Sequence, residues 1–198
     1  MEVMHKIDSY RKYMVTILLI AVNIIVFAVL SFQGDTEQAA FMAEHGAMYP
    51  DLIVKEGEWW RLFTAVFLHF GFRHLINNMF LLGCVGSRLE AGIGHIRYLL
   101  VYLAAGLGGN LLSLWQMISS GDYAVSAGAS GAIFGLMGGL LLLVIRHHGH
   151  YEALTTKGLL FMALFCLYCG YSTEGVNNWA HLGGFVSGFL CSLLLLIF

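Results

Sequence analysis

The residues best suited to do chemistry in this sequence are a serine and a histidine set in apolar surroundings. Ser130 lies in the stretch SAGASGAIFGLMGGLLLL (126–143), and His181 lies in the apolar run 176–198. A serine hydroxyl becomes an effective nucleophile when a neighbouring base accepts its proton. Ser130 would attack a carbonyl carbon, and His181 would take the hydroxyl proton and return it to the leaving amine. The pair predicts nucleophilic catalysis on a peptide bond.

Donors for a developing oxyanion are also present. The segment 128–131, Gly-Ala-Ser-Gly, is typical of a helix start, where the first backbone N–H groups have no partner within the helix and the helix dipole is positive. The backbone N–H of Ser130 could therefore stabilise negative charge. His74 and Asn78 are four residues apart and share one helix face, and an asparagine side chain supplies amide donors.

No acidic residue accompanies the serine and the histidine. Asp and Glu are absent from the apolar runs defined below, and Glu90 follows the second of them. We therefore expect a dyad in which packing orients the imidazole. Phe134 lies one helical turn after Ser130 on the same face, so its ring is predicted to stack on the imidazole of His181.

Each of these residues also has an ordinary explanation. A serine in a membrane helix commonly bonds back to a carbonyl one turn earlier, and a lone histidine commonly serves packing or lines a pore. The GxSG pattern around Ser130 is weak by itself, because soluble hydrolases present it on a strand-to-helix elbow. The combination favours a functional site, since ionisable groups inside a membrane are costly and usually functional.

Composition places the chain in a membrane. Of its 198 residues 59% are hydrophobic and only 11% are charged, against about 25% charged residues in soluble proteins. The net charge of −2 gives no support to a nucleic-acid partner. Cys166 and Cys169 form a CxxC without a second ligand pair. We interpret them, with Cys84 and Cys191, as small buried apolar residues, and expect neither a metal nor a cofactor.

Six apolar runs approach the roughly 20 residues that a membrane-spanning helix needs. We predict an all-α polytopic bundle of six transmembrane helices that forms a single domain over residues 1–198. The fifth run is short and is extended back to Thr155, and the first is too long for a signal peptide and lacks a cleavage site. The runs are Met14–Phe32, Leu62–Val85, Ile96–Ile118, Ala127–Ile145, Leu159–Tyr171 and Val176–Phe198.

The distribution of positive charge favours cytoplasmic termini. Residues 1–13 would form a cytoplasmic segment, and residues 33–60 would form a large outer loop that is rich in Asp and Glu. We therefore predict a multi-pass protein of the plasma (inner) membrane. Seven of the ten Lys and Arg residues would then lie inside: Lys6, Arg11, Lys12, Arg88, Arg97, Arg146 and Lys157.

The even-numbered runs all pass from outside to inside, so their first thirds share the outer leaflet. Ser130 and His181 lie about 24 and 26 Å above the inner ends of their helices, which predicts a similar depth below the outer surface. Glycines at four-residue spacing let membrane helices approach closely, and such glycines adjoin both residues. They are Gly131, Gly135 and Gly139 in the fourth run, and Gly184 and Gly188 in the sixth.

At these residues the sequence strongly resembles the rhomboid family of intramembrane serine proteases, in its six-span bacterial form. The resemblance covers most of the chain from the first outer loop onward, and the order and spacing of its motifs are specific. The motifs are EWWRLFTAVFLHFGFRHLINN (58–78), GSRLEAGIG (86–94), YLAAGLGGNLLS (102–113), GASGAIFGLMG (128–138) and AHLGGFVSG (180–188).

The resemblance implies that Ser130 is the nucleophile and His181 the general base, and that His74 and Asn78 join the Ser130 N–H as oxyanion donors. Many family members carry Tyr where this chain has Phe134, so a hydrogen bond from that ring is not expected. The supporting positions are His69 in the same cavity, Trp60 and Arg61 in the outer loop, Phe134, Gly128 and Gly131 around the serine, and Gly184 and Gly188 beneath the histidine.

By the same resemblance, the partners would be transmembrane segments of other proteins, cut near the outer leaflet by a site that opens to the outer side of the lipid bilayer. Two alternatives stay open. The chain could be a catalytically inactive rhomboid-like protein that binds client transmembrane helices, since a fold does not guarantee activity. It could also be a channel or transporter, although it has neither an inverted repeat nor paired broken helices.

Overall fold

The computed structural model of the chain describes residues 12–173 and 175–197, and these residues are mostly helical apart from one small β-hairpin. The predicted cytoplasmic segment 1–13 therefore lies almost entirely outside the described residues. The elements are α2 (Met14–Gln33), α3 (Ala39–Glu44), α4 (Pro50–Val54), α5 (Arg61–Thr64), η1 (Ala65–Phe67), α6 (Gly71–Leu81), η2 (Leu82–Gly86), α7 (Ser87–Ile93), α8 (His95–Ser120), α9 (Ser130–Arg146), β1 (His150–Tyr151), β2 (Leu154–Thr155), α10 (Thr156–Tyr171) and α11 (Asn178–Ile197).

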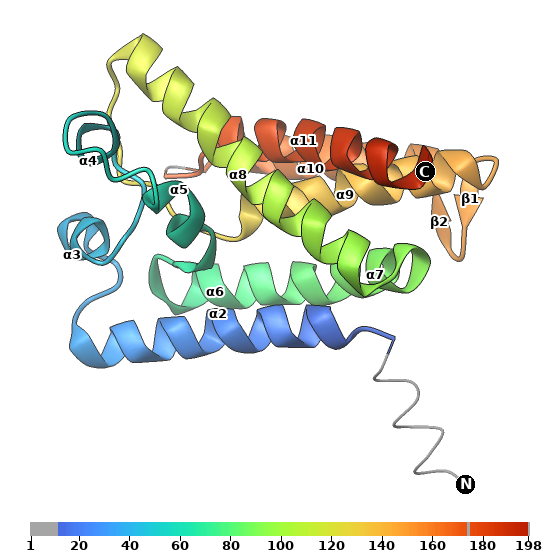
Figure 1. The fold of residues 1–198 in the computed structure, drawn as a ribbon, viewed down its shortest axis with the longest axis horizontal. Helices are drawn as coiled ribbons and strands as arrows, with labels where there is room; N and C mark the ends of the chain where they lie inside the picture. The colour runs from blue at the N-terminus through green and yellow to red at the C-terminus, as the bar shows by residue number, and fades with distance from the viewer. Residues whose placement is uncertain (1–11, 174, 198) are drawn as a thin grey trace, which may run out of the picture.

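The long helices form a bundle with α9 at its centre. Every residue of α9 from Gly131 to Val144 is buried, and α8 and α11 pack against it. Figure 1 shows α2 and α6 side by side below this group, with α8 crossing the bundle obliquely. Because other helices cover α9 on all sides, their packing fixes the position of its first turn.

Among the described residues, three helices are long and apolar enough to cross a membrane by length and composition: α2, α8 and α11. Two shorter apolar helices, α9 and α10, accompany them. The bundle therefore agrees with a multi-pass membrane protein, while the count of six crossings stays a prediction. The extension of the fifth run to Thr155 matches the helix, since the Thr155 hydroxyl accepts the backbone N–H of Gly158 at the start of α10.

The second predicted span, Leu62–Val85, is wrong as one continuous helix. The chain forms the short helices α5 and η1, turns at residues 68–70, and begins α6 only at Gly71. Gly71 has φ +71°, a backbone conformation that favours glycine. Hydropathy does not detect such a turn, because Leu68, His69 and Phe70 are as apolar overall as a helix would be. His69 consequently lies in the turn and not on the helix that carries His74.

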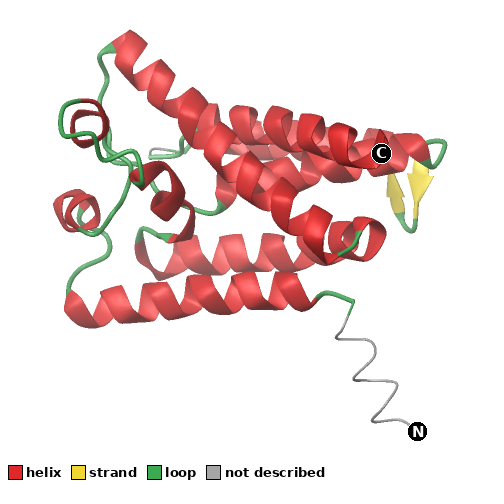
Figure 2. Ribbon diagram, viewed as in Figure 1, coloured by secondary structure: helices red, strands yellow, loops and turns green. Residues whose placement is uncertain are grey.

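Most of the loops that join the helices lie at one end of the bundle, as Figure 2 shows, and the hairpin of β1 and β2 lies at the other. The predicted outer loop contains the short helices α3 and α4, separated by a break at Gly46. Met48 forms an isolated antiparallel bridge with Ser126, four residues before Ser130. The outer loop is therefore joined directly to the segment that leads into α9.

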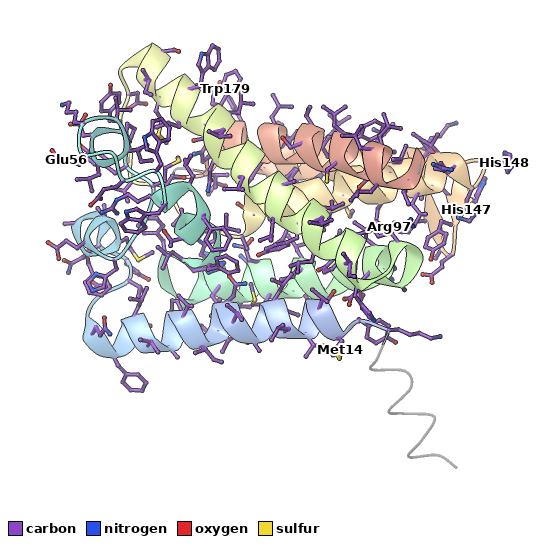
Figure 3. All side chains as sticks on the ribbon, viewed as in Figure 1. Met14, Glu56, Arg97, His147, His148 and Trp179 are labelled. Atoms are coloured by element: carbon purple, nitrogen blue, oxygen red, sulfur yellow. The ribbon has the colours of Figure 1, made fainter. Side chains whose placement is uncertain are left out.

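Figure 3 labels residues at both ends of the bundle. Glu56 and Trp179 lie at the loop end in Figure 3, whereas Met14, Arg97 and the histidines 147 and 148 lie at the hairpin end.

Between α7 and α2, the buried carboxylate of Glu90 accepts hydrogen bonds from the backbone N–H groups of Val15 and Thr16, both at 2.8 Å. The carboxylate of Glu90 therefore caps the start of α2.

Candidate active site

Ser130 is the first residue of α9, and His181 lies in the first turn of α11. The Oγ of Ser130 lies 2.9 Å from Nε2 of His181, which is hydrogen-bonding distance. His181 is buried and Ser130 is half-buried. The predicted contact between hydroxyl and imidazole is present, although 51 residues separate the two in the sequence.

Two groups hold the imidazole of His181 in place. The ring of Phe134 stacks on it, with ring centroids 4.3 Å apart and planes within 8° of parallel. At the edge of the ring, Nδ1 lies 3.3 Å from Oδ1 of Asn178. An amide oxygen accepts a hydrogen bond, so this contact favours a proton on Nδ1 and leaves Nε2 to accept from Ser130.

The sequence reasoning did not predict the contact between His181 and Asn178. Asn178 precedes His181 by three residues, so both lie on one face of the first turn of α11. That spacing is the only signal in the sequence that could have pointed to it. In this structure an uncharged amide oxygen therefore lies next to Nδ1 of His181.

The start of α9 presents free backbone donors beside Ser130. The first backbone hydrogen bond of the helix runs from the N–H of Ile133 to the carbonyl of Ala129, at 3.0 Å. The N–H groups of Ser130 and the next two residues precede that bond, as at any helix start. Gly128 has φ +145°, so the chain turns into the helix through a conformation that glycine adopts most readily.

The imidazole of His74 lies against the backbone at the same helix start. A methyl group placed on Gly128 would come within 2.9 Å of Cε1 and 3.0 Å of Nε2 of His74. Asn78 is buried, and its amide Nδ2 donates to the backbone carbonyl of His74 at 3.1 Å. An amide group carries two N–H donors, so one of them remains for a ligand. His69, also buried, lies edge-on to His74 with ring centroids 5.2 Å apart.

Glycines bring α9 and α11 into backbone contact beneath the dyad. A methyl group on Gly184 would overlap the carbonyl group of Gly131, and one on Gly188 would overlap the backbone of Gly135. The packing that the four-residue spacing predicted is present, and it allows short side chains on the two helices to meet.

The outer loop is held over this end of the bundle by Arg61, which is 5% exposed. Its Nη1 donates to the backbone carbonyls of Ala43 at 2.5 Å and Ala47 at 3.0 Å, and its Nε pairs with Glu58 at 2.5 Å. The guanidinium also lies 4.7 Å from the ring centroid of Trp60. Arg61 therefore holds the outer loop through its backbone carbonyls, and Trp60 lies against the guanidinium.

The residues that the structure describes include no cluster of three or more His, Cys, Asp or Glu side chains suited to a metal ion. All four cysteines are free thiols. The expectation that they are buried is wrong for Cys169, which is exposed, and Cys84, Cys166 and Cys191 are half-buried. The apolar surface of a membrane helix faces outward as well as inward, so apolarity alone did not place them.

A family model of the rhomboid domain matches residues 56–198 of the chain. The chain belongs to the rhomboid family. It is similar to the rhomboid protease GluP of Bacillus subtilis (strain 168), with 35% identity over 180 residues, 91% of this chain and 34% of GluP. It is also 42% identical over 147 residues to RHOMBOID-like protein 5 of Arabidopsis thaliana, covering 73% of this chain and 47% of that protein.

The putative rhomboid protease YdcA of Bacillus subtilis (strain 168) is 38% identical over 144 residues, which are 73% of this chain and 71% of YdcA. The chain thus spans between a third and a half of the length of GluP and RHOMBOID-like protein 5. Ser130 and His181 both lie within the matched rhomboid domain, whereas α2, α3 and α4 precede it. Membership of the rhomboid family and the apolar helices together indicate that the chain is a multi-pass membrane protein.

Proposed function

We propose that this rhomboid protein is an intramembrane serine endopeptidase that hydrolyses peptide bonds in or near transmembrane segments of other membrane proteins. The observation that carries the proposal is the 2.9 Å contact between Ser130 Oγ and His181 Nε2, with the imidazole stacked on Phe134. A nucleophile within hydrogen-bonding reach of an oriented base is the arrangement that covalent catalysis needs.

In the first step, Ser130 Oγ attacks the carbonyl carbon of the scissile peptide bond while His181 Nε2 takes the hydroxyl proton. The carbonyl oxygen becomes negative, and we expect the Ser130 N–H, His74 and Asn78 to donate to it. The C–N bond then breaks, and the imidazolium gives its proton to the leaving amine. Ser130 is left as an ester of the new carboxyl terminus.

In the second step, His181 takes a proton from water, and the hydroxide adds to the ester carbon. The bond from that carbon to Ser130 Oγ breaks, and the proton returns to the serine. Both steps use the same base and the same donors, so the site needs no cofactor for this reaction. A substrate helix hides its carbonyls in hydrogen bonds, so the segment that is cut must unwind locally, which Gly or Pro would favour.

The proposed site opens to the outer side of the plasma membrane, with both termini in the cytoplasm. The start of α2 and the end of α11 lie at the same end of the bundle as the β-hairpin, opposite the loops that surround Ser130 (Figure 1). The described Lys and Arg residues at the hairpin end include Arg88, Arg97 and Arg146. This distribution supports a cytoplasmic hairpin end.

The experiment is cleavage of a model single-span substrate and labelling by a fluorophosphonate, with purified wild-type protein, Ser130→Ala and His181→Ala. Ser119→Ala is a matched control, because Ser119 is exposed on α8. We expect cleavage and labelling in the wild type and the control, and neither in the two dyad variants. Cleavage by Ser130→Ala would refute the assignment. A wild type that binds the substrate helix without cutting it would favour the inactive, helix-binding alternative.

A further inference from the structure

Asn177 immediately precedes α11 and makes three side-chain hydrogen bonds to three different segments. Its Oδ1 accepts the backbone N–H of Ala180 at 3.0 Å, which caps the helix. Its Nδ2 donates to the hydroxyl of Ser113 at 2.5 Å and to that of Ser126 at 3.0 Å. Ser113 is fully buried, whereas Asn177 and Ser126 are half-buried, so these bonds are partly shielded from solvent.

The two serines anchor different parts of the site. Ser113 belongs to α8, which packs against both α9 and α11. Ser126 lies in the segment that leads into α9, four residues before Ser130. Its backbone is bridged to Met48 of the outer loop in both directions, at 2.9 and 2.8 Å. The segment is fixed again two residues later, where the N–H of Gly128 donates to the carbonyl of Ala65 at 2.9 Å.

The amide of Asn177 thus joins the start of the helix that carries His181 to the segment that carries Ser130. The glycine contacts between α9 and α11 set how closely the helices approach, but glycines offer no side chains that would resist sliding along the helix axis. A directional hydrogen bond at the helix starts supplies that resistance. The position of Nε2 against Oγ therefore depends on both features.

We propose that Asn177 is a positioning residue that fixes the axial register of His181 against Ser130, through Ser126 and Ser113. The inference rests on the proposed peptidase function, because its consequence is the reactivity of the dyad. Asn177 does not touch the reacting atoms, and no role was expected of it from the sequence. Its cap to Ala180 and its bonds to the two serines are separable by mutation.

The variant that separates them is Asn177→Ser. Serine is as good an N-cap as asparagine, so the bond to Ala180 is retained. Its side chain is shorter and has no amide, so it cannot donate to Ser113 and Ser126. Ser113→Ala/Ser126→Ala is the complementary variant, because it leaves Asn177 and its cap intact. Asn77→Ser, at an exposed position on α6, is the matched control.

The assays are the rate of fluorophosphonate labelling, the kcat and KM for a single-span substrate, and the Tm in detergent. We expect labelling and kcat to fall about tenfold or more in Asn177→Ser and in the serine double variant, as for other small misplacements of catalytic groups. KM and Tm should stay near wild type. Combining all three substitutions should add little further loss, because they break the same interaction.

Labelling of Asn177→Ser at the wild-type rate would overturn the proposal, and so would losses that simply add in the triple variant. A fall in Tm that accounts for the lost activity would show that Asn177 only stabilises the fold, and it would also overturn the proposal. If the wild-type protein neither labels nor cleaves, the peptidase function itself fails, which is a different result from a reactive wild type with an equally reactive Asn177→Ser.

Discussion

Replacing Gly184 with alanine should push apart the two helices that carry Ser130 and His181. The added methyl carbon would lie 2.7 Å from the carbonyl carbon and 3.1 Å from Cα of Gly131, where ordinary contacts are 3.4–4 Å. The obstacle is backbone, which cannot rotate away as a side chain could. Relief therefore requires α9 and α11 to separate locally by roughly 1 Å, since packed interiors have little free volume.

That displacement is enough to break the contact between the dyad residues. Ser130 Oγ and His181 Nε2 are 2.9 Å apart, so an added distance of about 1 Å exceeds the range of a hydrogen bond. A misplacement of this size costs about 10²-fold in rate. Overpacking of this kind costs about 1–3 kcal/mol in stability, so the protein should still fold.

Fluorophosphonate labelling and substrate cleavage measure the first effect, and the Tm in detergent measures the second. Gly83→Ala is the matched control, because a methyl group there would meet only Cδ1 of Ile20 at 3.8 Å. The reasoning is refuted if Gly184→Ala labels at the wild-type rate with an unchanged Tm. It is equally refuted if Gly83→Ala loses as much activity as Gly184→Ala.

Two further predictions concern Phe134 and Glu90. Phe134→Leu fills most of the space but removes the ring stacked on His181, so we expect about tenfold slower fluorophosphonate labelling. Phe134→Tyr keeps a ring and should label at the wild-type rate. Equal labelling rates in the wild type and both variants would contradict the orienting role of Phe134. Glu90→Gln replaces a buried carboxylate, whose two oxygens accept several hydrogen bonds at the start of α2, with an amide that has one accepting oxygen. The free energy of unfolding in detergent should therefore fall by about 3 kcal/mol. Glu152→Gln, an exposed change, should have no effect on unfolding, and the Glu90 reasoning fails if both variants unfold alike.

The parts of the site that the sequence predicted depend on helix geometry. Phe134 follows Ser130 by one turn, and the glycines of α9 and α11 recur every four residues, so a single sequence determines which faces they occupy. The start of α9 at Ser130 follows from the glycine and alanine before it. These local rules were enough to bring the serine and the histidine together once the runs were assumed to pack.

The parts that the sequence did not predict depend on contacts between distant segments. In the sequence, Glu90 is only an acidic residue after an apolar run. Its role becomes clear in the structure, where it accepts the backbone N–H of Thr16 at the start of α2, 74 residues earlier in the chain. The break before Gly71 is invisible to hydropathy, because the turn is as apolar as the helix. Asn178 and Asn177 look like ordinary polar residues at a helix start, which they also are.

Two kinds of interaction place the serine against the histidine, and they act in different directions. The glycines of α9 and α11 fix the distance between the helix axes through backbone contact, which tolerates no added carbon. The bonds from Asn177 fix the position along the axes through directional donors, which tolerate no shortening of the side chain. A methyl group at Gly184 and a serine at Asn177 should therefore weaken the same 2.9 Å contact by perpendicular displacements. Their effects on Tm should differ, because only the first disturbs the packed core.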